Sequence, residues 1–301
     1  MEGALEHLPV MRQEVVAMLC PSRREVFLDC TVGLGGHAKA LLAQAPPDSR
    51  LVGLDVDQHN LDQAARCLSR FAPRVQLQRA NFAEAKQVLN RTGLGAADAV
   101  LADLGLASAQ LADDRRGFSF SVDGPLDMRL DDRLKRTAAD MVNSMGEAEL
   151  ADLIYTNGQE RYSRRIARAI VSARGTKRIE RTVELARIVA KAYPRPARRS
   201  RRGVHPATRT FQALRIAVND ELDCLEALLR DLPDLLGAGG RACIISFHSL
   251  EDRRVKHAFA AMASKGQAKL LTKKPLVPTA QEIAENPRSR SAKLRGLERI
   301  E

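Results

Sequence analysis

The chain has 301 residues, of which 45% are apolar and 28% are charged, so it can bury a large core and is not disordered as a whole. Its five cysteines are scattered, with no C-x-x-C pair and no neighbouring histidine cluster, which argues against a metal site and against a secreted disulfide framework. No apolar run approaches the roughly 18 residues of a membrane span, so we expect a cytoplasmic protein that does not insert into membranes.

The net charge of +11 is concentrated in one part of the sequence. Residues 161–202 contain 15 lysines and arginines but only two acids, which gives this segment +13 and leaves −2 for the rest. Such a block is typical of a docking surface for a polyanion, whereas a solvated helical face, the alternative, would normally mix both signs. With only 4% aromatic residues and no tryptophan, a nucleic acid would be held mainly by charge.

Short apolar runs alternate with helical patterns over the first 105 residues. Strands are predicted at residues 25–30, 50–55, 75–77 and 97–101, and helices at residues 37–44 and 60–71. This alternation is typical of a parallel sheet with helices on both faces.

The pattern changes between residues 112 and 214, where no strand is predicted and the helices are basic. These helices are expected at residues 148–155, 164–173 and 182–192. An amphipathic helix at 217–232, a glycine-rich turn at 237–240 and an apolar strand at 241–247 follow. We therefore predict one α/β domain made of residues 1–111 and 215–301, interrupted by an inserted, basic, all-helical domain at residues 112–214 that binds the substrate.

A glycine-rich run, DCTVGLGGH at residues 29–37, ends the first strand and opens a helix. Glycines let the backbone bend tightly and approach a ligand closely. The second strand ends in Asp55, 20 residues past Gly35, where a carboxylate can accept hydrogen bonds from ribose hydroxyls. Gly33, Gly35 and Ala38 also fit the dinucleotide pattern, so a nicotinamide-dependent dehydrogenase stays open, as does a glycine turn without a ligand.

Two further features favour a methyl donor over a dinucleotide. Asn81 and Phe82 follow the third strand, where an adenine ring could meet a polar group and an apolar face. The fourth strand ends in Asp103, which places a carboxylate beside the ends of the first two strands, where open α/β sheets bind ligands.

Nine unusual strings, distributed from end to end, carry a specific resemblance. They are HLPVM at 7–11, DCTVGLGGH at 29–37, GLDVD at 53–57, ADLGLASAQL at 102–111, RGFSFSVDGPLDMRLD at 116–131, ERYSRRIARAIV at 160–171, HPATRTFQALRIAVNDEL at 205–222, ISFHSLEDRRVK at 245–256 and NPRSRSAKLR at 286–295. On these strings the chain resembles the bacterial 16S ribosomal RNA cytosine-N4 methyltransferase family (RsmH, formerly MraW).

The resemblance implies a Rossmann-like class I methyltransferase sheet with a helical insertion. It also implies S-adenosylmethionine as methyl donor and transfer to the exocyclic N4 of a cytidine in the decoding region of 16S rRNA in the small ribosomal subunit. By motif, the implied donor-binding residues are Gly35, Gly36, His37, Asp55, Phe82, Asp103 and Gln110. The chain departs from the family at Ala107, where a serine is frequent, but no donor-binding position is lost. A homodimer stays open, as does an RNA-binding assembly factor with a vestigial donor site.

The cytosine amino group is a poor nucleophile, so the enzyme must align it and accept its proton. Asp103 is the predicted catalytic acceptor, although the D/N-P-P-Y/F motif of many amino methyltransferases is missing. Neither His205 nor His248 is assigned a proton-transfer role.

Six arginines are the predicted RNA contacts. They are Arg198, Arg199, Arg201 and Arg202, expected on phosphates, and Arg129 and Arg209, expected near the target nucleotide. For Arg129 and Arg209 the alternative is a structural ion pair with a neighbouring aspartate. Residues 286–295 either bind RNA or lock the C-terminus onto the sheet.

Overall fold

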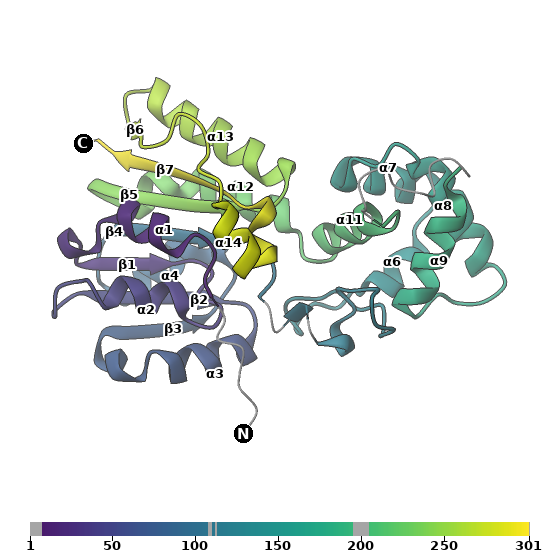
Figure 1. Ribbon diagram of the computed structural model, residues 1–301, viewed down its shortest axis with the longest axis horizontal. Coiled ribbons are helices and arrows are strands. Elements are labelled where there is room, and N and C mark those ends of the chain that lie inside the picture. Colours follow the sequence, from purple (N-terminus) through teal and green to yellow (C-terminus); the bar gives the residue numbers. More distant parts are fainter. Residues whose placement is uncertain (1–7, 108–109, 112, 195–204, 301) are drawn as a thin grey trace. The chain divides into compact units, whose positions relative to one another are not determined.

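The computed structural model describes residues 8–107, 110–111, 113–194 and 205–300 of the chain. They fall into two compact units (Figure 1). The first, which we call the α/β unit, joins Met1–Gly105 to Leu222–Glu301, and the second, the helical unit, is Leu106–Glu221. None of the described helices combines the length and the apolar character that a bilayer crossing requires.

A seven-stranded sheet in the order β3-β2-β1-β4-β5-β7-β6 forms the centre of the α/β unit (Figure 1). Its strands are β1 (Val26–Asp29), β2 (Arg50–Asp55), β3 (Val75–Arg79), β4 (Ala97–Asp103), β5 (Leu236–Ser246), β6 (Ala268–Leu270) and β7 (Lys293–Arg299). Strands β1 to β5 pair in parallel, and β7 runs antiparallel to both β5 and β6. The predicted Rossmann-like class I methyltransferase sheet with helices inserted after β4 is confirmed.

Helices cover both faces of this sheet, because successive side chains of a strand point to opposite faces. On β1, Phe27 belongs to one apolar cluster and Leu28 to the other. The Phe27 cluster includes α1 (Arg12–Leu19), α2 (Gly36–Leu42) and α3 (Gln58–Cys67), and the Leu28 cluster includes α4 (Ala85–Thr92), α12 (Glu221–Leu235) and α13 (Ser249–Ser264). A further helix, α14 (Ala280–Glu285), holds the N-terminal segment, since Glu282 Oε1 accepts a hydrogen bond from the Met11 amide at 2.6 Å.

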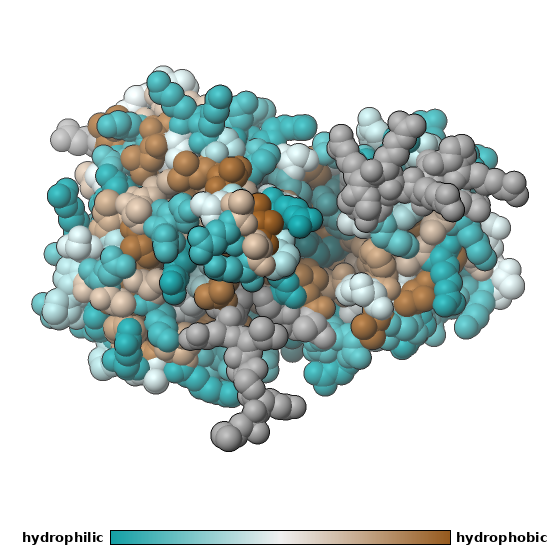
Figure 2. Space-filling view, viewed as in Figure 1, coloured by the Kyte–Doolittle hydropathy of each residue, from teal (hydrophilic) through white to brown (hydrophobic). Residues whose placement is uncertain are grey.

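The helical unit has its own apolar core, which includes Ile154, Ile166, Leu185 and Phe211. Its helices are α6 (Ala138–Ser144), α7 (Glu147–Gly158), α8 (Ser163–Arg174), α9 (Thr182–Ala192) and α11 (Thr208–Val218). Short 3-10 helices lie in both units. The α/β unit contains η1 (Pro21–Arg23), η2 (Ser69–Arg74), η3 (Phe82–Glu84) and η5 (Pro287–Ser291), and the helical unit contains η4 (Asp114–Arg116). On the visible face of the molecule, apolar side chains form only small groups among hydrophilic ones (Figure 2).

The helical unit is longer than the predicted insertion at residues 112–214. On its N-terminal side, Leu106 and Leu111 pack against its core. On its C-terminal side, α11 belongs to it, because Phe211 and Val218 are buried in the same core. Apolar packing therefore sets both boundaries a few residues outside those expected from the change of pattern.

The amphipathic helix predicted at residues 217–232 is present as α12, but it begins at Glu221, because the chain breaks between α11 and α12. Asp220 has a left-handed φ of 48° there. The Asn219 side chain accepts a hydrogen bond from the Leu130 amide at 2.7 Å and donates one to the Met128 carbonyl at 2.8 Å. These long-range bonds fix the break, and a local sequence pattern cannot reveal them.

The glycine-rich residues 237–240 were predicted to form a turn before the strand, and this prediction is wrong. These residues lie inside β5, where the register jumps from the pair Ala97–Leu236 to the pair Ala99–Arg241. The glycines therefore form an irregularity within the strand rather than a turn before it.

The C-terminal segment locks the chain onto the sheet. Strand β7 pairs with β5, and both Lys293 and Arg295 form ion pairs with Asp252 of α13, at 3.1 and 2.7 Å. These contacts support the structural alternative for this part of residues 286–295.

Candidate functional site

Three aspartates end three neighbouring parallel strands. Asp29 ends β1, and Asp55 and Asp103 end β2 and β4 on its two sides. The register pairs Asp29 with Gly53 and with Leu101, so the three carboxyl groups share one edge of the sheet. Open α/β sheets bind their ligands at this carboxyl edge. The structure thus brings Asp55 and Asp103 to the same edge, as the sequence predicted.

The loop between β1 and α2 bends toward β2. Gly33 and Gly35 have φ angles of +51° and +83°, which residues with side chains rarely adopt. The Gly33 amide donates a hydrogen bond to Asp55 Oδ2 at 3.0 Å. A Cβ atom on Gly36 would lie 2.5 Å from Cγ of Pro9, so the N-terminal segment packs directly on this loop.

The Asp55 carboxylate is held in one orientation. Its Oδ1 accepts a hydrogen bond from the Asp57 amide at 2.9 Å, and its Oδ2 accepts one from Asn60 Nδ2 at 3.2 Å. Asp57 in turn caps α3 by accepting from the His59 amide. Burial raises the pKa of Asp55 to about 6, against the opposing effect of the hydrogen bonds from Asp57 and Asn60. A carboxylate fixed in this way is suited to accept hydrogen bonds from ribose hydroxyls.

A second group of side chains surrounds the end of β4. His37, near the start of α2, places its Nε2 3.5 Å from Asp103 Oδ2. The Asp103 amide donates a hydrogen bond to the Thr31 hydroxyl at 2.6 Å, and the Thr31 amide donates one to Asp29 Oδ1 at 3.1 Å. Asp29 and His37 are 1% and 7% exposed, whereas the Asp103 side chain is partly exposed, so the group reaches from the buried interior to the surface. We call Asp29, His37 and Asp103 the acidic cluster.

Several polar atoms of the acidic cluster are buried with no hydrogen-bond partner among the described residues. They are Asp29 Oδ2, both ring nitrogens of His37 and Asp103 Oδ1. Buried polar atoms are nearly always paired in folded proteins, and an unpaired one costs about 1–3 kcal/mol. A ligand with positive charge and hydrogen-bond donors would satisfy the two carboxylate oxygens, and an acceptor on the ligand would satisfy the N–H of His37. The residues present therefore fit a cationic nucleoside.

Phe82 follows β3, as predicted, and begins η3. Its ring is half-buried and packs against the apolar cluster that contains Leu28. The side-chain oxygen of Asn81 accepts a hydrogen bond from the Ala83 amide, and Glu84 bonds back to the Asn81 amide. Asn81 is therefore occupied as a helix cap, and Phe82 is the residue of this pair left to contact a ligand.

The remaining predicted donor residue, Gln110, belongs to the helical unit. Its side chain is buried and its Oε1 accepts a hydrogen bond from the Ala107 amide at 2.9 Å. The structure thus collects Gly35, Gly36, His37, Asp55, Phe82 and Asp103 in the α/β unit and Gln110 in the other.

The two predicted nucleotide contacts differ from one another. Arg129 makes a bidentate ion pair with Asp127, with both nitrogen-to-oxygen distances at 2.8 Å, which is the structural alternative. Arg209 donates to the Gln159 carbonyl at 3.1 Å, and no carboxylate pairs with it in the described part of the chain. Arg198, Arg199, Arg201 and Arg202 lie outside the described residues.

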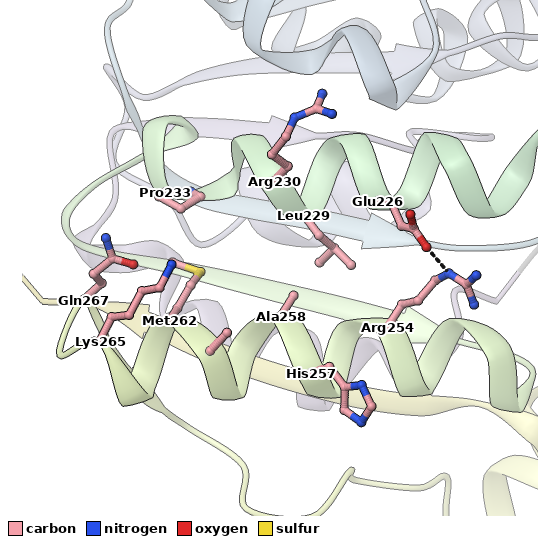
Figure 3. A pocket seen from close by; sticks show the side chains of 11 residues that line it. Glu226, Leu229, Arg230, Pro233, Arg254, His257, Ala258, Met262, Lys265 and Gln267 are labelled. Atoms are coloured by element: carbon pink, nitrogen blue, oxygen red, sulfur yellow. Dashed lines mark hydrogen bonds and ion pairs between the residues drawn. The ribbon is translucent and has the colours of Figure 1, made fainter.

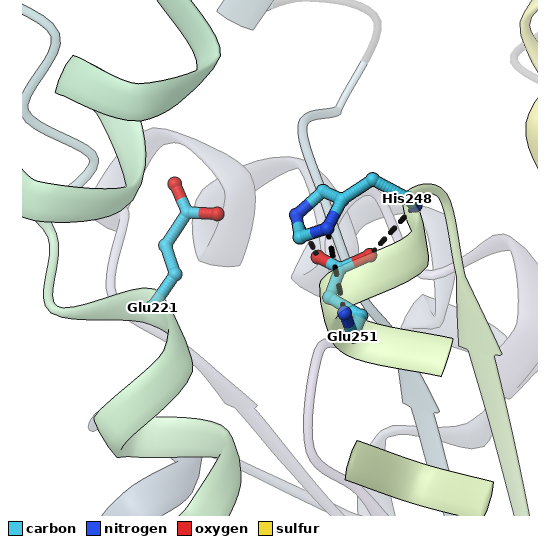
Figure 4. A group of neighbouring side chains, drawn as sticks. All are labelled: Glu221, His248 and Glu251. Atoms are coloured by element: carbon cyan, nitrogen blue, oxygen red, sulfur yellow. Dashed lines mark hydrogen bonds and ion pairs between the residues drawn. The ribbon is translucent and has the colours of Figure 1, made fainter. Parts of the chain in front are cut away.

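His248 and His205 have structural contacts. His248 caps α13: its Nδ1 accepts a hydrogen bond from the Glu251 amide, and its Nε2 lies 3.1 Å from Glu251 Oε1 (Figure 4). His205 accepts from the Ala207 amide, and its ring lies 4.7 Å from the ring of Phe120.

A groove of about 430 Å³ runs between α12 and α13 (Figure 3). Its floor includes Leu229, Ala258 and Met262, and an ion pair between Arg254 and Glu226 crosses it at 2.7 Å. No predicted donor residue lines this groove.

The sequence reasoning missed Asp29, Thr31 and Pro9, although all three lie in strings that were singled out. Asp29 was the detectable one, since an acid that ends the first strand occupies the same kind of position as Asp55 and Asp103. The contact between Pro9 and Gly36 joins segments that no local pattern connects.

The sheet order, with the antiparallel strand β7 between β5 and β6, and the acidic, glycine-lined carboxyl edge are those of an α/β methyltransferase. The sequence model of the MraW methylase family matches residues 4–300. The chain belongs to this family.

Curated relatives match along nearly the whole chain. The chain is 47% identical to a protein of Syntrophobacter fumaroxidans, over 98% of this chain and 97% of that one, and 48% identical to one of Synechococcus elongatus, over 99% and 96%. Both are named ribosomal RNA small subunit methyltransferase H. Among solved structures, the O-methyltransferase TomG from Streptomyces achromogenes, in complex with its methyl donor, matches at a TM-score of 0.46 with 11% identity, over 98% of this chain and 83% of that one.

Proposed function

We propose that the protein transfers a methyl group from S-adenosylmethionine to the exocyclic N4 of a cytidine in the decoding region of 16S rRNA. The names of its relatives support ribosomal RNA of the small subunit as substrate. The observation that carries the reaction is the acidic cluster, in which Asp103 ends a strand with a buried, unpaired Oδ1. Such a substrate would place the reaction in the bacterial cytoplasm.

We infer that the donor is held at the carboxyl edge of the sheet. Gly35 and Gly36 would let the loop backbone approach the donor, Asp55 would accept hydrogen bonds from the ribose hydroxyls, and Phe82 would cover the adenine ring. His37 and Asp103 would line the part of the site that holds the amino-acid end and the methyl group. Gln110, in the helical unit, is a donor residue by family motif alone. The fixed Asp55 and the unpaired atoms of the acidic cluster support this assignment.

The chemistry asks little of the protein beyond alignment and proton removal. When bound, S-adenosylmethionine supplies an electrophilic methyl group attached to a cationic sulfur. Once the methyl group is transferred, this sulfur becomes the neutral thioether of the product. The N4 lone pair of cytosine is delocalised into its ring, so N4 must be held in line with the methyl group and must lose a proton as the new N–C bond forms. The carboxylate of Asp103 is the proposed acceptor: it would first accept a hydrogen bond from the N4 amino group and then take its proton.

The RNA surface proposed here includes the start of α8. Arg161, Arg164 and Arg165 are exposed, and none of them has a carboxylate partner within the described part of the chain. Arg168, one turn further, is paired with Glu147. We call the first three the α8 arginines.

The position of the α8 arginines is unfavourable for the helix itself. The N-terminus of a helix carries partial positive charge, so cations at this end are destabilising. Arg164 and Arg165 lie in the first turn of α8, and Arg161 directly precedes its N-cap Tyr162. Helix α8 has no acid in its first turn and no side-chain cap to offset them. An external anion such as an RNA phosphate would relieve this repulsion, which supports α8 as part of the RNA surface. Arg209 and the predicted arginines at 198, 199, 201 and 202 would extend it.

Replacing all three α8 arginines with glutamine should weaken RNA binding in a salt-dependent way. Each phosphate contact contributes about 0.7–0.9 to the slope of log affinity against log salt. We therefore expect the triple variant to lower this slope by about 2, measured by titrating a small-subunit rRNA fragment at several salt concentrations. Thermal stability should not fall, because the helix loses a repulsion.

Arg133→Gln is the matched control, since Arg133 is an exposed arginine of the helical unit that is already ion-paired with Asp131 at 2.7 Å. It should leave the slope nearly unchanged. A triple variant with the wild-type slope would show that α8 does not contact phosphates.

The proposed reaction is tested by mapping methylated cytidines in small-subunit rRNA by mass spectrometry. Cells that contain the protein should carry an N4-methylated cytidine in the decoding region, and cells that lack it should not. Complementation with the wild-type protein should restore the mark, and an unchanged pattern in the deletion strain would refute the proposal. A protein that binds the donor and immature subunits without restoring the mark would be an assembly factor instead.

A further inference from the structure

Asp29 is the most deeply buried acid of the site and was not assigned a role above. Its side chain is 1% exposed, and one carboxyl oxygen accepts a single hydrogen bond, from the Thr31 amide. The other oxygen has no hydrogen-bond partner among the described residues. A buried carboxylate in this state is unstable unless a cation approaches or a proton binds.

We propose that Asp29 carries a proton in the donor-free protein and releases it when the cationic donor binds, so that donor affinity depends on pH. The donor carries a sulfonium and an ammonium group, either of which would stabilise the ionised carboxylate. The proton passes to solvent, and no other reactant is required. This inference rests on the donor site proposed above and not on the identity of the RNA substrate.

The groups around Asp29 favour this exchange. Burial is the main cause that raises the pKa of Asp29, to about 7. The negative charges of Asp103 on β4 and Asp55 on β2 raise it further, whereas His37 on α2 and the hydrogen bond from Thr31 lower it. Cys30, the next residue along the chain, is itself buried and stays protonated, because burial raises its pKa. The carboxyl groups of Asp103 and Asp55 thus lie close enough to Asp29 to raise its pKa, and a bound cation would stabilise the ionised carboxylates.

The direction of the effect follows from linkage. In the donor-free protein, Asp29 is protonated below about pH 7 and ionised above it. The donor binds better to the protein in which Asp29 is ionised. At low pH the proton on Asp29 must be released before the donor can bind tightly, so the affinity is lower there. Affinity should therefore rise from pH 6 to about pH 8 and then level off. Between pH 8 and pH 6, the dissociation constant should increase by about tenfold.

The experiment is calorimetric titration of the full-length protein with S-adenosylmethionine, without RNA, at pH 6, 7 and 8. At pH 7, titrations in two buffers of different ionisation enthalpy should show release of about half a proton per donor bound. This measurement needs no variant, so it does not depend on the folding of a mutant.

Asp29→Asn identifies the group that releases the proton. This near-isosteric variant should bind with a dissociation constant that changes little between pH 6 and 8, and the proton release at pH 7 should disappear. Asp62→Asn, which changes an exposed acid on α3 of the same unit, should keep the wild-type dependence. Asp55, whose pKa is raised to about 6, would leave at most a residual effect at the acidic end of this range.

S-adenosylhomocysteine separates the two cationic groups, because it keeps the ammonium but lacks the sulfonium. The same pH dependence with this ligand would assign the proton release to the ammonium, and its loss would assign the release to the sulfonium. Wild-type protein that binds with no proton release, or Asp29→Asn protein that keeps the release, would overturn the inference. Failure of donor binding at every pH would instead contradict the donor site itself.

Discussion

Replacing Asp103 with asparagine is expected to slow methyl transfer by about 100-fold at saturating donor, the range typical for loss of a positioned proton acceptor. Asparagine keeps the size of the side chain but cannot take a proton from N4. The backbone bond from the Asp103 amide to Thr31 is retained, so the end of β4 should stay in place. The measurement is single-turnover transfer to small-subunit rRNA, with donor affinity determined separately by calorimetry.

The role of Asp103 follows from comparing two effects of the variant: its effect on the rate of methyl transfer at saturating donor and its effect on donor affinity. Asp62→Asn on the surface of the same unit is the control and should leave both quantities unchanged. If Asp103→Asn weakened donor binding but left the saturated rate intact, Asp103 would contact the donor alone and the proton would leave by another route.

Gly36→Ala is expected to weaken donor binding by at least about tenfold, because the new methyl group would lie 2.5 Å from Cγ of Pro9. Either the glycine loop or the N-terminal segment must then move, and a moved loop would disturb the hydrogen bond from the Gly33 amide to Asp55. Donor affinity measured by calorimetry should report this displacement directly.

A double variant shows whether the clash is the cause. Pro9→Ala removes the Cγ and Cδ atoms that a Cβ on Gly36 would meet, at 2.5 and 3.3 Å, so Pro9→Ala with Gly36→Ala should recover much of the lost affinity. Gly146→Ala is the control, since a Cβ there meets nothing within 4 Å. An additive loss in the double variant would mean that Gly36 is needed for a reason other than its contact with Pro9.

The first half of the sheet could be predicted because its signals are local. Short apolar runs bounded by glycines and acids mark β1, β2, β3 and β4, and each strand lies within a few residues of its predicted place. The late strands β6 and β7 were not predicted, because Ala268–Leu270 is too short and Lys293–Arg299 too polar to show an apolar pattern. They are strands because β5 offers β7 a partner, which is a property of the assembled sheet.

The candidate site divides in the same way. Asp55 and Asp103 could be predicted to converge, since parallel strands share a carboxyl edge. The acidic cluster could not, because it depends on the approach of His37 to Asp103 and on the burial of Asp29. For the arginines, sequence could not decide between a nucleotide contact and an ion pair. Arg129 is held by Asp127 because the turn of the backbone between them brings the two side chains together.

The interruption of the α/β unit has a consequence for the nascent chain. By the time the ribosome has made β4, the strands β3, β2, β1 and β4 can assemble, but the outer edge of β4 has no neighbour until β5 is synthesised, after the whole helical unit. An unpaired strand edge is an aggregation hazard, and the helical unit, rich in local contacts, can fold during this delay. Translation must therefore pass through a stage in which the sheet is incomplete. The outer edge of β4 stays unpaired until the C-terminal quarter of the protein supplies β5.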